Sequence, residues 1–232
     1  MRDTTLQLLD EQGVFGVIEF LAARPDPLIA TRTFAEVVGH LYWKQKDMHR
    51  TVVMAQAGIQ FGLTAAIAAS HHAPDRAMEI RSVVKGLAYD LGSFTWPGWN
   101  EPGIGISAAY LTFGSEAARL NLRFAHDLNK GDLPISRAFW LVGAHCLSSG
   151  EFEVAARHFT SAETHAQTAG ASEEALLNKG YGCLAAALLT PQEAGNEGPL
   201  VRILAQLSET SDGADLAAQL QTAWIVLARS CT

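Results

Sequence analysis

Two residues one helical turn apart, Glu36 and His40, form the pair in this chain whose types and spacing best suit proton-transfer chemistry. An i, i+4 spacing places both side chains on one helix face, where a carboxylate and an imidazole can act as acid and base. The same spacing also suits hydrogen bonding to a bound ligand, or simple solvation. We favour these two uses over catalysis, and we predict that the chain holds no catalytic residue.

The remaining histidines do not have the spacing of a metal site. His71 and His72 are adjacent at an expected helix end, where their side chains diverge around the helix axis. His158, Glu163 and His165 share one expected helix. Glu163 and His165 lie five and seven positions after His158, whereas a zinc helix needs a compact i, i+4 pair. We therefore expect no bound metal.

Sequence fingerprints of common enzymes and cofactor sites are also absent. The chain contains no GxSxG, HExxH, P-loop or dinucleotide-binding glycine motif. Gly103-Ile104-Gly105 lacks the third glycine and follows a proline-rich stretch rather than a strand. These observations predict a protein that is not an enzyme and needs no cofactor.

Composition places the chain among folded proteins and argues against nucleic acid as a partner. Its 232 residues are 48% hydrophobic and 18% charged. The 24 acidic residues outnumber the 17 basic ones, for a formal charge of −7, whereas phosphate binding needs clustered basic residues. The three cysteines are an odd number without a CxxC spacing, which predicts neither disulfides nor a zinc site and points to a reducing cytoplasm.

Membrane association is also not expected. Residues 1–12 are charged and lack the apolar run of a secretory signal. The stretch 52–71 has no Asp, Glu, Lys or Arg, but Gln56, Gln60 and two glycines interrupt it. We interpret it as a helix packed by neighbours on most sides rather than as a membrane span.

These side chains must be positioned by helices, because apolar residues recur at three- and four-residue spacing and no sustained strand alternation is present. Caps and breakers give the expected boundaries, with Asp26, Asp47 and Pro74-Asp75 at helix starts and Gly13, Gly150 and Gly170 at helix ends. The expected helices are 5–12, 14–23, 27–44, 47–70, 74–91, 132–149, 151–169, 172–189, 199–208 and 214–230. Residues 191–198 are expected to form a turn-rich loop. The fold class is predicted as all-α.

Within this pattern, one set of small and aromatic residues recurs. The later copy consists of Phe139, Val142, Gly143, Cys146, Ala155, Phe159 and Ala162, with Gly150 and Phe152 at the turn, and the earlier copy of Val38, Gly39, Tyr42, Asp47, Met48, Thr51, Ala55 and Gly58. The set resembles the tetratricopeptide repeat (TPR), a helix-turn-helix unit of roughly 34 residues. The resemblance implies antiparallel helix pairs that stack into a short TPR-like α-solenoid.

A third, disguised copy lies between these two. Its positions are Tyr89, Gly92 and Phe94 in a first helix and Ala118, Leu122 and Ala125 in a second. This register leaves an insert near 95–114, which contains Trp96 and Trp99 and too many prolines and glycines to be helical. The two tryptophans either anchor the loop on the helix ends or form a lid or recognition loop.

In the TPR family the first helices of the pairs line a concave groove that holds a peptide or protein partner. The resemblance carries the groove positions onto Thr33, Glu36, His40, Trp43 and Lys44 in one repeat and onto Arg137, Trp140, Ala144, Leu147 and Ser148 in the other. We expect Glu36, His40, Trp43, Lys44, Arg137, Trp140, Trp96 and Trp99 to make up the binding site. For Trp43 and Trp140, packing between repeats is an equal alternative to ligand contact.

The expected organisation is N-terminal capping helices over 1–26, repeats over 27–190 and C-terminal capping helices over 191–232. By resemblance, the chain is a non-enzymatic cytoplasmic scaffold for a protein or peptide partner. Two alternatives stay open. One is a small-molecule-binding regulator or enzyme whose pocket over Glu36 and His40 is covered by the Trp96–Trp99 loop. The other is a self-assembling homo-oligomer, dimerised through the apolar terminal helix around residues 224–227.

Overall fold

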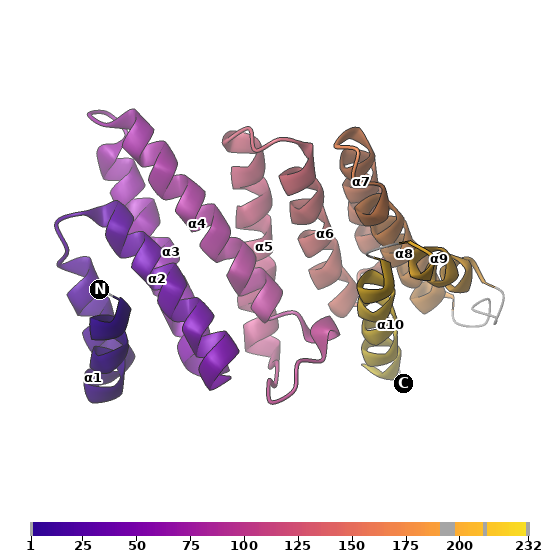
Figure 1. Ribbon diagram of the computed structural model, residues 1–232, viewed down its shortest axis with the longest axis horizontal. Coiled ribbons are helices and arrows are strands. Elements are labelled where there is room, and N and C mark those ends of the chain that lie inside the picture. Colours follow the sequence, from indigo (N-terminus) through magenta and orange to yellow (C-terminus); the bar gives the residue numbers. More distant parts are fainter. Residues whose placement is uncertain (1, 191–197, 211–212, 231–232) are drawn as a thin grey trace. The chain divides into compact units, whose positions relative to one another are not determined.

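The computed structural model describes residues 2–190, 198–210 and 213–230, and every regular element in this part of the chain is a helix (Figure 1). The all-α prediction is confirmed. The elements are α1 (Arg2–Ala22), α2 (Pro27–His40), η1 (Leu41–Gln45), α3 (Met48–Ala69), α4 (Pro74–Phe94), η2 (Pro97–Trp99), α5 (Ala108–Asp127), α6 (Asp132–Ser148), α7 (Phe152–Thr168), α8 (Ser172–Leu189), α9 (Pro199–Ser208) and α10 (Gly213–Ser230). Most of the expected loop at 191–198 lies outside the described residues.

Side-chain caps begin two of the helices where the sequence indicates them. A carboxylate oxygen of Asp26 accepts hydrogen bonds from the backbone N–H groups of Leu28 and Ile29 at 3.0 and 3.2 Å, and Pro27 occupies the first helical position of α2. Asp47 caps α3 in the same way, accepting from the Arg50 N–H at 2.9 Å. Each cap satisfies N–H groups that have no partner inside the helix.

The backbone departs from regular α-helix at two places, a kink in α1 and a π-helical segment after α2. Gly13 has φ 70° and ψ −167° inside α1, so the first two expected helices are contiguous but kinked at this glycine. Residues 41–45 form a π-helix, η1, which the sequence pattern does not predict. It ends at Gln45, and the left-handed φ of 53° at the following Lys46 turns the chain toward α3.

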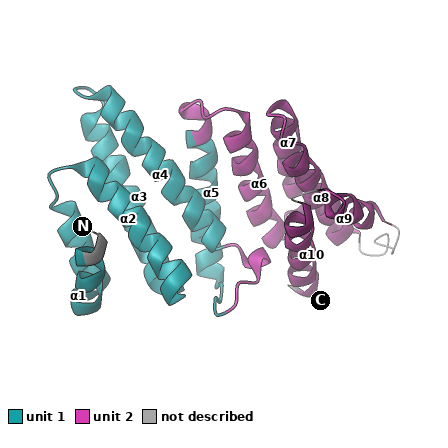
Figure 2. Cartoon of the chain, in the orientation of Figure 1, with its two compact units in different colours: residues 1–95, 103–124 teal, residues 96–102, 125–232 magenta. Residues whose placement is uncertain are grey.

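The chain divides into two compact units, and neither is a single continuous stretch of the sequence (Figure 2). Unit 1 comprises residues 1–95 and 103–124, and unit 2 comprises residues 96–102 and 125–232. The segment 96–102 therefore belongs to a different unit from the residues on both sides of it. The boundaries expected at 26/27 and 190/191 fall inside unit 1 and unit 2, respectively, and stay predictions.

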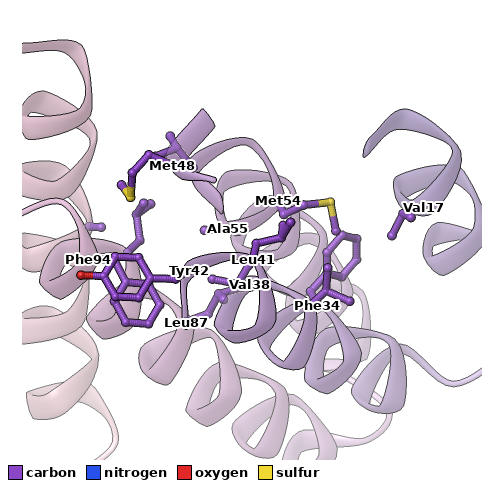
Figure 3. Packing of buried hydrophobic residues seen from close by; sticks show 14 of the residues in the cluster. Val17, Phe34, Val38, Leu41, Tyr42, Met48, Met54, Ala55, Leu87 and Phe94 are labelled. Carbon is purple, nitrogen blue, oxygen red and sulfur yellow. The ribbon is translucent and has the colours of Figure 1, made fainter. Parts of the chain in front are cut away.

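The core of unit 1 forms where α2, α3 and α4 pack together (Figure 3). Phe34, Leu41 and Met54 are fully buried there, and the Tyr42 and Phe94 rings stack with centroids 3.8 Å apart. Small residues on α3 allow this close packing. A Cβ atom added at Gly58 would lie 2.7 Å from side-chain atoms of both Phe34 and Leu87.

The core of unit 2 is built by α6, α7, α8, α9 and α10, with α7 packed on both α6 and α8. The packing of α6 on α7 is tight at Gly143, where an added Cβ would lie 2.8 Å from the Phe159 ring. The buried Ser136 hydroxyl donates to the Ala162 carbonyl at 2.7 Å and accepts from the Asn178 amide at 3.2 Å. This polar chain links the same three helices, α6, α7 and α8.

Candidate functional site

The expected binding residues of the first repeat lie on one face of α2 and its π-helical continuation. Glu36, Trp43 and Lys44 are exposed, and His40 is half-buried. Glu36 and His40 are not joined by a hydrogen bond in the described structure; the Nε2 atom of His40 instead lies 3.4 Å from the amide nitrogen of Gln45. A hydrogen bond between an acid and a base is therefore not preformed at this pair.

Trp43 is held by aromatic neighbours while most of its own surface stays accessible. It is 54% exposed, and its ring meets the Tyr42 and Phe94 rings edge to face, with centroid distances of 4.8 and 5.7 Å. The Lys46 ammonium lies 5.4 Å from its centroid, within cation–π range. Tyr42 belongs to η1 and Phe94 to α4, so these two elements together fix the orientation of an exposed indole.

The expected binding residues of the later repeat have different environments. Arg137 is exposed on α6 and forms an ion pair with Glu174 of α8, with Nε 3.1 Å from a carboxylate oxygen. Trp140 is only 7% exposed. Ala144 and Leu147, which the resemblance also assigns to the groove, are fully or almost fully buried. At these three positions the side chains are taken up by internal packing.

Trp96 is a core residue of unit 2. The sequence had left it either as an anchor of the insert or as part of a lid. It is 1% exposed, and its indole N–H donates to the Ala144 carbonyl of α6 at 2.9 Å. Its ring packs against Trp99, Trp140 and Tyr181 at centroid distances of 4.9, 5.3 and 6.0 Å. This geometry is that of an anchor.

The rest of the insert follows Trp96 into unit 2. Trp99 is half-buried and contacts Trp140 at 5.5 Å between centroids, and η2 packs against α10 and α6. Tyr181 lies beneath, with its hydroxyl accepting a 3.0 Å hydrogen bond from Gln219 of α10. Burial raises the pKa of the Tyr181 hydroxyl well above its usual range. Its role is therefore that of a neutral, buried hydrogen-bonding group.

A pocket of about 350 Å³ opens in unit 1 between α3, α4 and α5. Its apolar wall is made of aliphatic and aromatic side chains, and its polar wall of two amides and one carboxylate. The apolar residues are Ile59, Leu91, Phe113, Ala117 and Leu120, and the polar ones Gln56, Gln60 and Glu116. The volume is at the lower end of the range for small-molecule sites.

Sequence reasoning missed this pocket, because it searched the first helices of the expected repeats, whereas α3 and α5 are second helices. A signal was present. Gln56 and Gln60 are the polar interruptions of the otherwise apolar stretch 52–71, and their i, i+4 spacing places both amides on one side of α3.

Three histidines of unit 2 gather around a single aromatic ring. The Phe139 centroid lies 5.8, 6.0 and 5.6 Å from those of His126, His158 and His165. His165 Nδ1 is 2.7 Å from a carboxylate oxygen of Asp132, which ties the end of α7 to the start of α6. Among the described residues no group of three or more His, Cys, Asp or Glu side chains has the geometry to hold a metal ion.

The two cysteines that the structure describes are free thiols. Cys146 is buried and Cys183 is half-buried, and burial raises the pKa of the Cys183 thiol. A raised pKa lowers the thiolate fraction, so Cys183 is poorly activated as a nucleophile. Cys231 lies outside the described residues.

Comparison of the chain with protein-family models, with curated proteins and with solved structures found no match. Among the described helices, α3 is long and apolar enough to cross a membrane by length and composition, a test that core helices of soluble proteins also pass.

Proposed function

We propose that the chain is a non-enzymatic, TPR-like helical scaffold that binds a peptide segment of a protein partner on the α2 face of unit 1. The observation that carries this proposal is the accessible, held indole of Trp43. Tryptophan is enriched among the residues that dominate binding energy at protein interfaces, and the aromatic neighbours of Trp43 hold its ring in place.

The packing of helices supports the repeat interpretation. The two clear sequence repeats correspond to the helix pairs α2/α3 and α6/α7, and in each pair the helices contact one another. Glu36, His40, Trp43 and Lys44 share one helix face, as the groove positions of a first helix do. In this proposal the peptide lies along that face. Trp43 belongs to the π-helix η1, which sets the direction of its side chain. Such π-helical distortions occur often at functional sites.

The energetic contribution of Trp43 sets the size of the expected effect. Covering an aromatic side chain contributes about 1.5–3 kcal/mol, and each 1.4 kcal/mol changes affinity about tenfold. We expect peptides selected from a displayed library on the full chain to lose more than tenfold in affinity for a Trp43→Ala variant. Fluorescence anisotropy with the labelled peptide measures the dissociation constant.

Phe15 provides the matched control. It is 77% exposed on α1 and is not one of the residues of the proposed site, so Phe15→Ala removes an exposed aromatic ring and leaves Glu36, His40, Trp43 and Lys44 in place. Peptide affinity should be unchanged in this variant. Equal losses in the two variants, or no peptide enriched above background, would overturn the proposal.

A further inference from the structure

We propose that the pocket between α3, α4 and α5 is a binding site for a small amphiphilic amine, a molecule with one ammonium group on an apolar body. This site is separate from the Trp43 face, and the inference does not depend on peptide binding there. It begins from the contrast between the two walls of the pocket.

The apolar wall provides the body of the ligand with a surface to cover. Leu91 and Ala117 are almost fully buried, while Ile59, Phe113 and Leu120 are half-buried. A volume of about 350 Å³ accepts a phenylalkyl or short alkyl group. Binding of an apolar body becomes more favourable in proportion to the apolar area that it removes from water.

The polar wall selects the charge of the ligand. Glu116 is exposed at the pocket and makes no ion pair or hydrogen bond with any described side chain, including Arg119 one turn further along α5. None of the eight lining residues is cationic. A lone carboxylate beside an apolar wall favours a cation over an anion.

The two glutamines add further hydrogen-bond acceptors to the lining of the pocket. The side-chain amides of Gln56 and Gln60 have no hydrogen-bond partner among the described residues, and both line the pocket. An ammonium group carries three donors. The Glu116 carboxylate and the two amide oxygens provide three acceptor groups in the lining, which equals the number of donors on one primary ammonium.

Three probes with one body and different heads test this assignment. They are 4-phenylbutylammonium, 4-phenylbutyrate and 4-phenylbutanol, titrated into the full chain and followed by amide chemical shifts. We expect the ammonium to bind most tightly, with a dissociation constant on the order of millimolar, and to shift amides of α3 and α5. Equal binding of the three heads, or shifts confined to other helices, would overturn the proposal.

Variants at Glu116 test the charge directly. Glu116→Gln keeps the shape and should weaken the ammonium probe about two- to fivefold, the effect of an exposed ion pair. Glu116→Lys should reverse the preference toward 4-phenylbutyrate. Glu153→Gln, which removes an exposed carboxylate from α7, should change nothing. An ammonium affinity that is the same in the wild type and both Glu116 variants contradicts the assignment.

The source of the ammonium is a separate arm of the same experiment. A lysine residue capped at both ends presents an ammonium on a four-carbon stem, as a partner protein would. We expect it to bind more weakly than 4-phenylbutylammonium, because it covers less of the apolar wall. Tighter binding of the capped lysine would contradict a small-molecule site and indicate a basic protein segment.

Discussion

Trp96 shows how strongly a single residue of the insert contributes to the core of unit 2. It is the largest of the fully buried side chains described, and its indole N–H is hydrogen-bonded to Ala144. Trp96→Phe removes this hydrogen bond and leaves a space beside Trp140. We expect the free energy of unfolding to fall by about 2–4 kcal/mol, measured by urea denaturation.

Trp43→Phe provides the comparison, because the Trp43 ring is 54% exposed. This variant should change the free energy of unfolding by less than about 1 kcal/mol. Similar losses in the two variants would show that Trp96 does not have the anchoring role that its burial indicates.

Asp90 makes the stability of unit 1 depend on pH. Burial raises the pKa of its carboxyl from 3.8 to about 6, against the opposing effect of Lys85. A raised folded-state pKa means that folding favours the protonated acid, so stability is lost as pH rises from about 4 to about 6. Asp90→Asn should therefore raise the free energy of unfolding at pH 7.5 by about 2–3 kcal/mol.

The measurement is urea denaturation of the wild type and Asp90→Asn at pH 4, 5, 6 and 7.5. The difference between the two should be near zero at pH 4 and should grow until about pH 6.5. A constant difference across this range would mean that the amide acts through packing and not through the titration of Asp90.

For single residues, the sequence alone did not predict whether a tryptophan is buried in the core or exposed at a binding surface. It left Trp96 and Trp99 undecided, because helical periodicity fixes which face a residue occupies only inside a helix, and these two lie in a loop. Trp140 was equally open, because groove-facing and core-facing positions are close neighbours around the same helix and the sequence pattern does not separate them. Contacts with Tyr181, which is 41 residues away from Trp140, decide its environment.

At the scale of elements, two glycines in neighbouring helices are expected to respond in opposite ways to alanine. A Cβ at Gly62 of α3 would lie 2.4 Å from Val84 and 3.0 Å from Thr31, while a Cβ at Gly86 of α4 would meet nothing within 4 Å. Gly62→Ala should destabilise by about 1–2 kcal/mol, because the steric cost exceeds the gain in helix propensity. Gly86→Ala should stabilise by about 0.5–1 kcal/mol.

Thermal and urea denaturation of both variants measure the difference. Circular dichroism of the folded proteins should show the same helix content, so that the change reflects packing and not refolding. A stabilised Gly62→Ala would contradict the tight junction of α2, α3 and α4 that the core of unit 1 requires.

Element boundaries were predictable where a single residue has a local chemical effect. Asp26, Asp47 and Gly13 begin or interrupt helices through caps or a positive φ, which depend on a few neighbouring atoms. The π-helix η1 was not predictable in this way, since it depends on competition between alternative backbone hydrogen bonds. The pocket was equally hidden, because its polar residues belong to two helices, with Gln60 of α3 and Glu116 of α5 lying 56 residues apart in sequence.

At the scale of the whole chain, neither unit is a continuous segment, because 96–102 interrupts unit 1 and belongs to unit 2. Sequence repeats do not predict such a division, since a repeat pattern describes each helix pair by its own residues. It follows that a cut at 124/125 separates unit 2 from part of its core. The fragment 125–232 lacks Trp96 and exposes Trp140 and Tyr181, which Trp96 contacts in the intact chain.

We expect the fragment 96–232 to unfold cooperatively in urea and the fragment 125–232 to bind 8-anilinonaphthalene-1-sulfonate and unfold without a clear transition. Loss of a buried tryptophan costs about 3–5 kcal/mol, a large share of the roughly 5–15 kcal/mol that stabilises a typical domain. Trp96→Ala in the longer fragment separates the side chain from mere chain length and should reproduce the behaviour of 125–232. If both fragments instead unfold at the same urea concentration, the segment 96–102 only rests on unit 2 and contributes nothing to its stability.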